Sequence, residues 1–149
     1  MLHEWEWYDG STDSLFPMVD STEFQDRPYF LHQANGEIYY ADPSTYQDDG
    51  RALKVLVQTS RFDADTAHVK FCSRLEVLGD WESTTSNMTI YHSDDDYKTW
   101  STGRTVNLAD RAYLYRCGSF RRRAWRLYSE SNNSMRLYAI ELELDGGTH

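Results

Sequence analysis

The sequence lacks most of the features that mark an enzyme, a membrane protein or a disulfide-bonded domain. No apolar run approaches the length that spans a bilayer. It contains no Gly-rich phosphate loop, no CxxC pair and no Gly-x-Ser-x-Gly elbow. The only cysteines are Cys72 and Cys117, which we expect to be two buried thiols rather than a disulfide. We therefore expect a protein that is not an enzyme, has no cofactor or metal, and does not contact a membrane.

Basic residues are missing from the N-terminal end. Residues 1–26 contain seven acids and no Lys or Arg, and they do not have the basic start and apolar run of a secretory signal. Residues 101–149 contain eight Arg against five acids, although the whole 149-residue chain has a net charge of −9. An acidic body repels the phosphates of nucleic acid. We therefore expect the basic C-terminal third to meet an acidic surface, such as a neighbouring copy of the chain.

A sustained helical period is absent as well, and apolar residues alternate with polar ones instead. Aromatic residues make up 15% of the chain, which favours strands and subunit contacts. In residues 68–78 the alternation puts Phe71, Leu75 and Val77 on one face. The pattern predicts an all-β fold, either an antiparallel β-sandwich or a partial propeller-like module. Its strands are expected at residues 53–60, 68–78, 87–92, 104–108, 112–117, 124–129 and 135–144.

The N-terminal residues are predicted to lie outside this β-domain. Residues 3–9 alternate as an edge strand does, and residues 10–28 are rich in Ser, Thr and Asp without a period, which predicts a loop or arm. We therefore expect an acidic strand and arm at 1–28 and an antiparallel β-domain at 29–149. That domain begins with a predicted hairpin around Asn35-Gly36, a pair that favours a tight type I′ turn.

The most informative motif is the run Ser-Asp-Asp-Asp-Tyr-Lys-Thr-Trp at residues 93–100. Asp95 is placed to accept N–H bonds within its own turn, Ser93 and Thr99 to bond locally, and Trp100 to anchor the loop from below. The run resembles the Asp-box, the hairpin loop of sialidase-type propeller blades, with Tyr97 where Gly is usual. The alternative is an ordinary acidic hairpin tip. An Asp-box is structural, and a left-handed Tyr97 would cost about 1–2 kcal/mol.

Two charged runs have a chemical and a structural interpretation. Residues 94–96 would suit a hard cation such as Ca²⁺, but a solvated turn is the simpler expectation. The arginines at 121–123 with Arg126 lie beside Trp125 and Tyr128, which suits nucleic acid. The alternative is contact with carboxylates of another subunit, and the net charge favours it. We therefore take four residues as subunit-interface candidates: Arg121, Arg122, Arg123 and Arg126.

The order of several motifs resembles the C-terminal part of the packaged-DNA stabilisation proteins of short-tailed phages, which are also called tail hub or nozzle proteins. The similarity covers roughly residues 29–144. Members of that family are much longer chains, so this chain resembles either a compact relative or a different tail or collar component with the same β-module. The resemblance rests on residues 36–42, 46–50, 71–77, 93–100 and 115–119.

The resemblance implies a virion structural protein of the phage tail or head-to-tail joint (a head-tail connector). Such proteins form homo-oligomeric rings around the DNA exit channel, contact other tail, adaptor or portal proteins, and pass the genome without sequence-specific contact. The location would be the virion, with assembly in the host cytoplasm. A carbohydrate-binding β-module is the alternative, with Trp5, Trp7 and Trp81 as candidate platforms. A sialidase-type hydrolase is not expected, because 149 residues cannot close a propeller.

Overall fold

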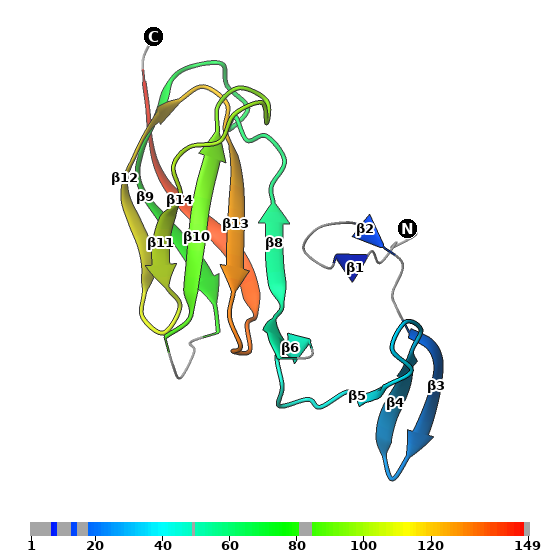
Figure 1. Ribbon diagram of the computed structural model, residues 1–149. Coiled ribbons are helices and arrows are strands. Elements are labelled where there is room, and N and C mark those ends of the chain that lie inside the picture. Colours follow the sequence, from blue (N-terminus) through cyan, green and yellow to red (C-terminus); the bar gives the residue numbers. More distant parts are fainter. Residues whose placement is uncertain (1–6, 9–12, 15–17, 49, 81–84, 148–149) are drawn as a thin grey trace. The chain divides into compact units, whose positions relative to one another are not determined.

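The chain folds into antiparallel β-sheets, as a computed structural model shows (Figure 1). The structure describes residues 7–8, 13–14, 18–48, 50–80 and 85–147. Within these ranges there is no helix, so the all-β prediction is confirmed. It follows that none of the described residues belongs to a helix long and apolar enough to cross a membrane.

The chain divides into two compact units, Met1–Thr45 and Tyr46–His149. The first unit has a short β1–β2 pair (Trp7–Tyr8 and Asp13–Ser14) and a three-stranded sheet of β3 (Met18–Phe24), β4 (Arg27–His32) and β5 (Ile38–Tyr40). The predicted boundary after residue 28 is therefore wrong. Residues 18–24, predicted as loop or arm, form β3 and pair with β4, which also pairs with β5.

The two hairpins of this sheet use turns that differ from the expected one. Gln25 and Asp26 connect β3 to β4 with φ of 51° and 59°, the positive pair of a type I′ turn. The predicted β4–β5 hairpin is confirmed, but its type I′ turn at Asn35-Gly36 is wrong because only Gly36 has a positive φ. Side chains stabilise a longer loop instead: His32 Nδ1 accepts the Ala34 N–H, and Asn35 Oδ1 accepts the Glu37 N–H.

The second unit is a β-sandwich, preceded by a hairpin of β6 (Gln47–Asp48) and β7 (Arg51–Ala52). One sheet has the order β11-β10-β13-β8, and the other has the order β12-β9-β14. Each predicted strand is present with shifted ends: β8 (Lys54–Gln58), β9 (Lys70–Gly79), β10 (Asn87–Ser93), β11 (Arg104–Asn107), β12 (Ala112–Phe120), β13 (Ala124–Glu130) and β14 (Leu137–Gly146).

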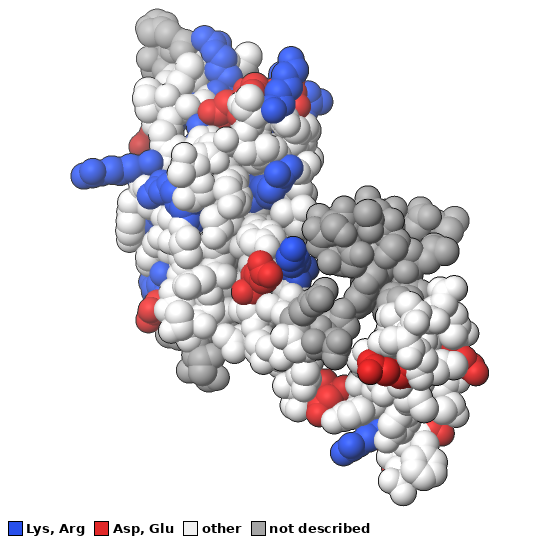
Figure 2. Space-filling model, in the orientation of Figure 1, with Lys and Arg blue, Asp and Glu red and all other residues white. Residues whose placement is uncertain are grey.

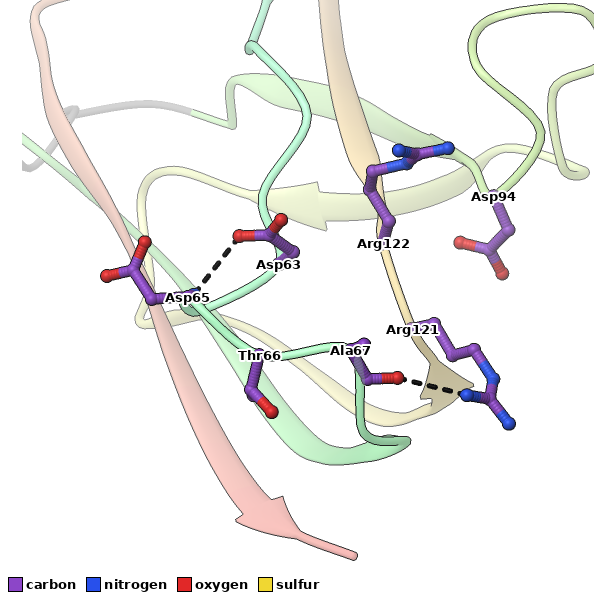
Figure 3. Close-up of a pocket in the computed structure, with 7 residues that line it drawn as sticks. All are labelled: Asp63, Asp65, Thr66, Ala67, Asp94, Arg121 and Arg122. Carbon is purple, nitrogen blue, oxygen red and sulfur yellow. Dashed lines mark hydrogen bonds between the residues drawn. The ribbon is translucent and has the colours of Figure 1, made fainter. Parts of the chain in front are cut away.

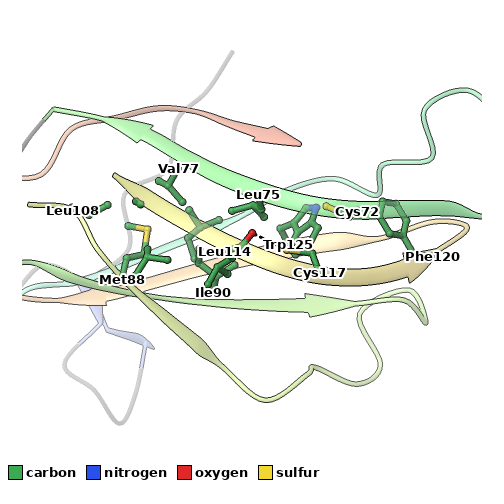
Figure 4. Close-up of a cluster of buried hydrophobic side chains, with 13 residues drawn as sticks. Cys72, Leu75, Val77, Met88, Ile90, Leu108, Leu114, Cys117, Phe120 and Trp125 are labelled. Atoms are coloured by element: carbon green, nitrogen blue, oxygen red, sulfur yellow. Dashed lines mark hydrogen bonds between the residues drawn. The ribbon is translucent and has the colours of Figure 1, made fainter. Parts of the chain in front are cut away.

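Inward-facing side chains from both sheets form the core (Figure 4). Leu75 of β9, Ile90 of β10 and Trp125 of β13 are among its buried residues. Both cysteines are buried and free, as expected. Burial, and then the neighbouring Cys117, raise the pKa of the Cys72 thiol to about 12, so this thiol stays protonated and is not a nucleophile at neutral pH.

Irregular pairing moves some aromatic side chains away from the predicted face. Phe71 was expected beside Leu75 in the core, but it is 54% exposed while Cys72 is buried. The register between β9 and β14 shifts where Arg74 and Cys72 pair with the consecutive residues Glu143 and Leu144. The extra residue, Ser73, reverses the alternation, because a bulge exchanges the two faces of a strand.

Truncation of a core leucine should test the sandwich. Leu75 is 0% exposed, whereas Leu56 on the edge strand β8 is 60% exposed. We expect Leu75→Ala to lower the free energy of unfolding by about 2–5 kcal/mol through lost burial and a cavity. Leu56→Ala is the matched control and should cost well under about 1 kcal/mol. Urea denaturation of the two variants measures the difference, and equal losses would contradict this core.

Candidate functional site

The loop between β10 and β11 has the hydrogen bonds expected of an Asp-box. Asp95 Oδ1 accepts bonds from the Ser93 hydroxyl at 2.8 Å and the Thr99 N–H at 2.9 Å. Its Oδ2 accepts the Thr99 hydroxyl at 2.6 Å, and the Ser93 Oγ accepts the Tyr97 N–H at 3.0 Å. These bonds stabilise the carboxylate and lower the pKa of Asp95 from 3.8 to about 2, with the Thr99 hydroxyl as the largest cause.

Tyr97 adopts the left-handed backbone that a glycine would provide, with a φ of 69°. Its side chain gains contacts that a glycine lacks. The hydroxyl donates to the Thr59 carbonyl oxygen at 3.4 Å, and the ring centroid lies 6.2 Å from that of Trp100. These contacts offset part of the strain of a Cβ at positive φ.

Trp100 anchors the loop from outside the core. Its ring is half-buried, and the Arg126 guanidinium carbon lies 3.8 Å from its centroid. Arg126 also donates two hydrogen bonds to Gln58 Oε1, at 3.2 and 2.9 Å. The loop is therefore fixed to the outer face of the β11-β10-β13-β8 sheet by a cation–π contact.

Arg123 lies at the centre of this end of the sandwich. Its side chain is only 2% exposed, and its Nε and Nη2 bind the two carboxylate oxygens of Asp94 at 2.6 and 2.7 Å. Nη1 donates to the Cys117 carbonyl oxygen, and the guanidinium carbon is 4.5 Å from the Phe120 ring centroid. The charge is thus paired and hydrogen-bonded, as a buried guanidinium requires.

A second buried cation, Lys70, lies on the same Phe120 ring, with Nζ 6.0 Å from the centroid. Its ammonium donates three hydrogen bonds, to the carbonyl oxygens of Thr66 at 2.7 Å, His68 at 2.9 Å and Arg121 at 2.7 Å. All three of its N–H groups are therefore used to hold the loop that precedes β9.

The acidic run at 94–96 is not organised as a cation site. Asp94 binds Arg123, and Asp95 is occupied by its own loop. Asp96 forms ion pairs with Arg61 and Arg122, at 3.1 and 3.0 Å. No group of three or more His, Cys, Asp or Glu among the described residues is arranged to hold a metal ion.

A surface hollow of about 830 Å³ lies beside this cluster (Figure 3). Asp63, Asp65 and Asp94 contribute carboxylates to it, and Arg121 and Arg122 contribute guanidinium groups. The Asp65 N–H bonds to Asp63 Oδ1, and Arg121 donates to the Ala67 carbonyl oxygen. These groups are therefore engaged in the loops themselves, and they do not converge on a common point.

The structure revises one of the four subunit-interface candidates. The prediction is wrong for Arg123, which is buried within its own chain and is not accessible to a neighbour. Arg121 and Arg122 remain exposed, with bonds to Ala67 and Asp96. Arg126 is half-buried beneath Trp100. An arginine run in a sequence does not show which member turns inward, and here Arg123 is buried in alternation with Trp125 and Leu127 of β13.

Sequence reasoning missed a second basic surface, on β12 and its neighbours. We call it the β12 edge, and it consists of Arg104, Arg111, Tyr113, Tyr115 and Arg116. Figure 2 shows blue side chains projecting from the side of the sandwich on which β12 lies in Figure 1. The signal was weak because these arginines are spaced several residues apart in the sequence.

A groove of about 400 Å³ on the outer face of the β12-β9-β14 sheet adjoins this edge. It is lined by Tyr113, Arg111 and four acidic residues, of which Glu76 and Glu141 are directly paired across β9 and β14. Like charges opposite each other are unfavourable in a sheet. Of the Trp platforms predicted for glycan binding, residues 5 and 81 and the side chain of Trp7 are outside the described part of the structure.

Comparison with protein-family models and with curated proteins finds no match to this chain.

Loss of the Asp94 charge should destabilise the sandwich far more than loss of the Asp96 charge. Asp94→Asn leaves the buried Arg123 without its counter-ion, which should cost about 3 kcal/mol or more. Asp96→Asn is a matched control, because its partners Arg61 and Arg122 are exposed, and it should cost under about 1 kcal/mol. Chemical denaturation at neutral pH measures both, and a larger loss for Asp96→Asn would contradict the assignment.

The Asp95 loop should lose its stabilising effect in acid. Because the pKa of Asp95 is lowered on folding, its carboxylate stabilises the folded state above pH 3.8, and this contribution is lost as the pH falls through about 2. Above pH 3.8 the free energy of unfolding of wild type should exceed that of Asp95→Asn by a constant amount. Between pH 3.8 and about 2 this difference in stability should become smaller. Thermal melts of both proteins across the acid range measure the difference, and a difference independent of pH would refute this ionic role.

Proposed function

We propose that this chain is a structural protein of a virus particle, located in the phage tail or the head-to-tail joint. Copies of it form a ring around the DNA exit channel, beside other tail, adaptor or portal proteins. The genome passes through the ring without sequence-specific contact. The tail assignment rests on the order of motifs that resembles the tail hub family, and the ring-forming role also has support from the charge and burial of the two units.

The chemistry at the loop end of the sandwich supports a non-catalytic role. The charged side chains at this end bind other parts of their own chain and hold loops and strand ends together. Asp94 binds Arg123, Asp95 binds Thr99, and Lys70 binds three carbonyl groups. Cys72 is buried and has a raised pKa. A rigid module of this kind suits a repeating position in an assembly.

The observation that carries the proposal is the separation of charge between the two units. Residues 1–45 contain nine acids and one Arg, a net charge of −8. Residues 46–149 contain 14 Lys and Arg and 15 acids, a net charge of −1, and some of their arginines lie exposed on the β12 edge. Opposite charge on two different surfaces favours contact of one surface with the other on the next copy, which closes into a ring when the rotation allows.

A carbohydrate-binding module remains the second candidate, and the groove on the outer face favours it. Tyr113 provides a ring there, and Glu76 and Glu141 provide acceptors for sugar hydroxyls. However, the guanidinium groups of Arg74 and Arg111 lie 5.1 and 5.9 Å from the Tyr113 centroid and compete with a sugar for its faces. Glycan binding by a monomeric chain would favour this candidate over the ring.

The ring and its inner surface can be tested together by cryo-EM of the purified chain. We expect closed oligomers around a channel whose lining is net negative, because an acidic wall repels DNA phosphates and lets the genome slide. Mass photometry over a range of concentrations should show one preferred copy number. A chain that stays monomeric at high concentration would contradict the ring, and a net-positive lining would contradict the proposed passage of DNA.

A further inference from the structure

The β12 edge is a continuous surface that combines positive charge with aromatic rings. Arg104 of β11 donates to the carbonyl oxygens of Tyr115 at 2.7 Å and Arg116 at 3.4 Å. The Tyr115 ring lies 5.9 Å from the Tyr113 ring, whose hydroxyl accepts a bond of 2.7 Å from Arg111. Tyr115 is 57% exposed. Exposed arginines and tyrosines side by side are the composition of protein contact surfaces.

Arg116 is held in a strained backbone that directs it outward. The β12–β9 register shifts between Tyr115 and Gly118, and in this bulge Arg116 has a φ of 56°. A non-glycine residue at positive φ costs energy, and bulges commonly re-aim a side chain. Arg116 is exposed, and no hydrogen bond or ion pair joins its side chain to another described residue.

The sheet of the first unit has the opposite properties. Its registers place Phe24, Tyr29, Leu31, Ile38 and Tyr40 on one face. In the β3-β4-β5 sheet itself, Arg27 lies over part of that face, with its guanidinium carbon 5.5 Å from the Tyr40 centroid, while Ile38 is 69% exposed. A unit of 45 residues with net charge −8 has too little core to be stable alone, so this face needs a cover.

Topology favours a second copy as the cover. The first unit joins the sandwich at Tyr46, whose N–H bonds to Asn132, and the chain then enters the sheet through β8. Strand β8 is at one edge of the four-stranded sheet, and β11, which carries Arg104, is at the other. The chain that follows the acidic unit therefore enters the sandwich at the edge opposite to the basic one, which suits a head-to-tail contact between copies.

We propose that the β12 edge of one copy binds the acidic, aromatic N-terminal sheet of a second copy. This contact rests on the ring-forming function proposed above and names its two surfaces. Arg116 and its neighbours attract the carboxylates of the incoming sheet, and the exposed tyrosines cover part of its apolar face. The carboxylates available on that sheet include Asp20, whose pairing with Leu31 puts it on the apolar face.

Charge reversal in the full-length chain tests the contact. We expect Arg116→Glu to raise the dissociation constant for self-association about tenfold or more in sedimentation velocity. Lys98→Glu is the matched control: it makes the same charge change at an exposed position outside the edge, and it should associate as wild type does. Ile38→Asn tests the other surface independently and should also weaken association.

Crosslinking identifies the occupant. Chains with Asp20→Cys, on the apolar face, and chains with Arg116→Cys are mixed and treated with a short bismaleimide, while native Cys72 and Cys117 are buried. We expect crosslinked dimers from the mixture. Crosslinks found only when both substitutions are in one chain would overturn the proposal, because the cover would then be the chain's own sandwich.

Other outcomes separate the failure of this contact from the failure of the proposed function. If wild type assembles and Arg116→Glu assembles equally well, the contact is wrong and the ring survives. If wild type stays monomeric at high concentration, both are wrong. Salt-dependent capture of duplex DNA that Arg116→Glu abolishes, with self-association unchanged, would overturn the contact in favour of a phosphate-binding edge.

Discussion

The buried ion pair between Arg123 and Asp94 is the interaction on which the loop end of the sandwich depends. The two residues are 29 positions apart, and the guanidinium also holds the Cys117 carbonyl group. The backbone of Arg123 pairs in both directions with Phe62. A buried guanidinium without all its acceptors is strongly unfavourable, so the Asp-box loop, the bulged end of β12 and the Phe62 segment must be in place together.

Lys70 extends this arrangement. It lies on the same Phe120 ring as Arg123 and binds three carbonyl oxygens that no strand partner satisfies. At this end of the sandwich, buried cations hold the chain segments together, as apolar packing does in the middle. A consequence for function is that these loop-end charges are paired within the chain: Asp94 binds Arg123, and Asp96 is shared by Arg61 and Arg122. On the β12 edge, by contrast, Arg104, Arg111 and Arg116 form no ion pair with a carboxylate of the described residues.

Interactions between residues close in the sequence were predictable, and interactions between distant segments were not. Alternation located the sandwich strands, and the Asp95 bonds were foreseeable because their partners lie within four residues. The exposure of Phe71 was not, because a bulge depends on the partner strand. The inward turn of Arg123 was missed for a similar reason, since its counter-ion belongs to a distant loop. Strand β3 was not predicted because most of its side chains are exposed, so its sequence does not show the alternation of a half-buried strand.

Segregated charge gives the proposed assembly a direction as well as an affinity. Two acidic N-terminal sheets repel each other, and so do two β12 edges, so a symmetric dimer through either surface is disfavoured. Only the unlike pair is attractive, and it leaves one surface of each kind open at the ends of a growing chain of copies. An apolar sheet with too little core gains its cover in the same step. Assembly and burial of this apolar face are then a single event, and closure into a ring is the state in which no such sheet remains exposed.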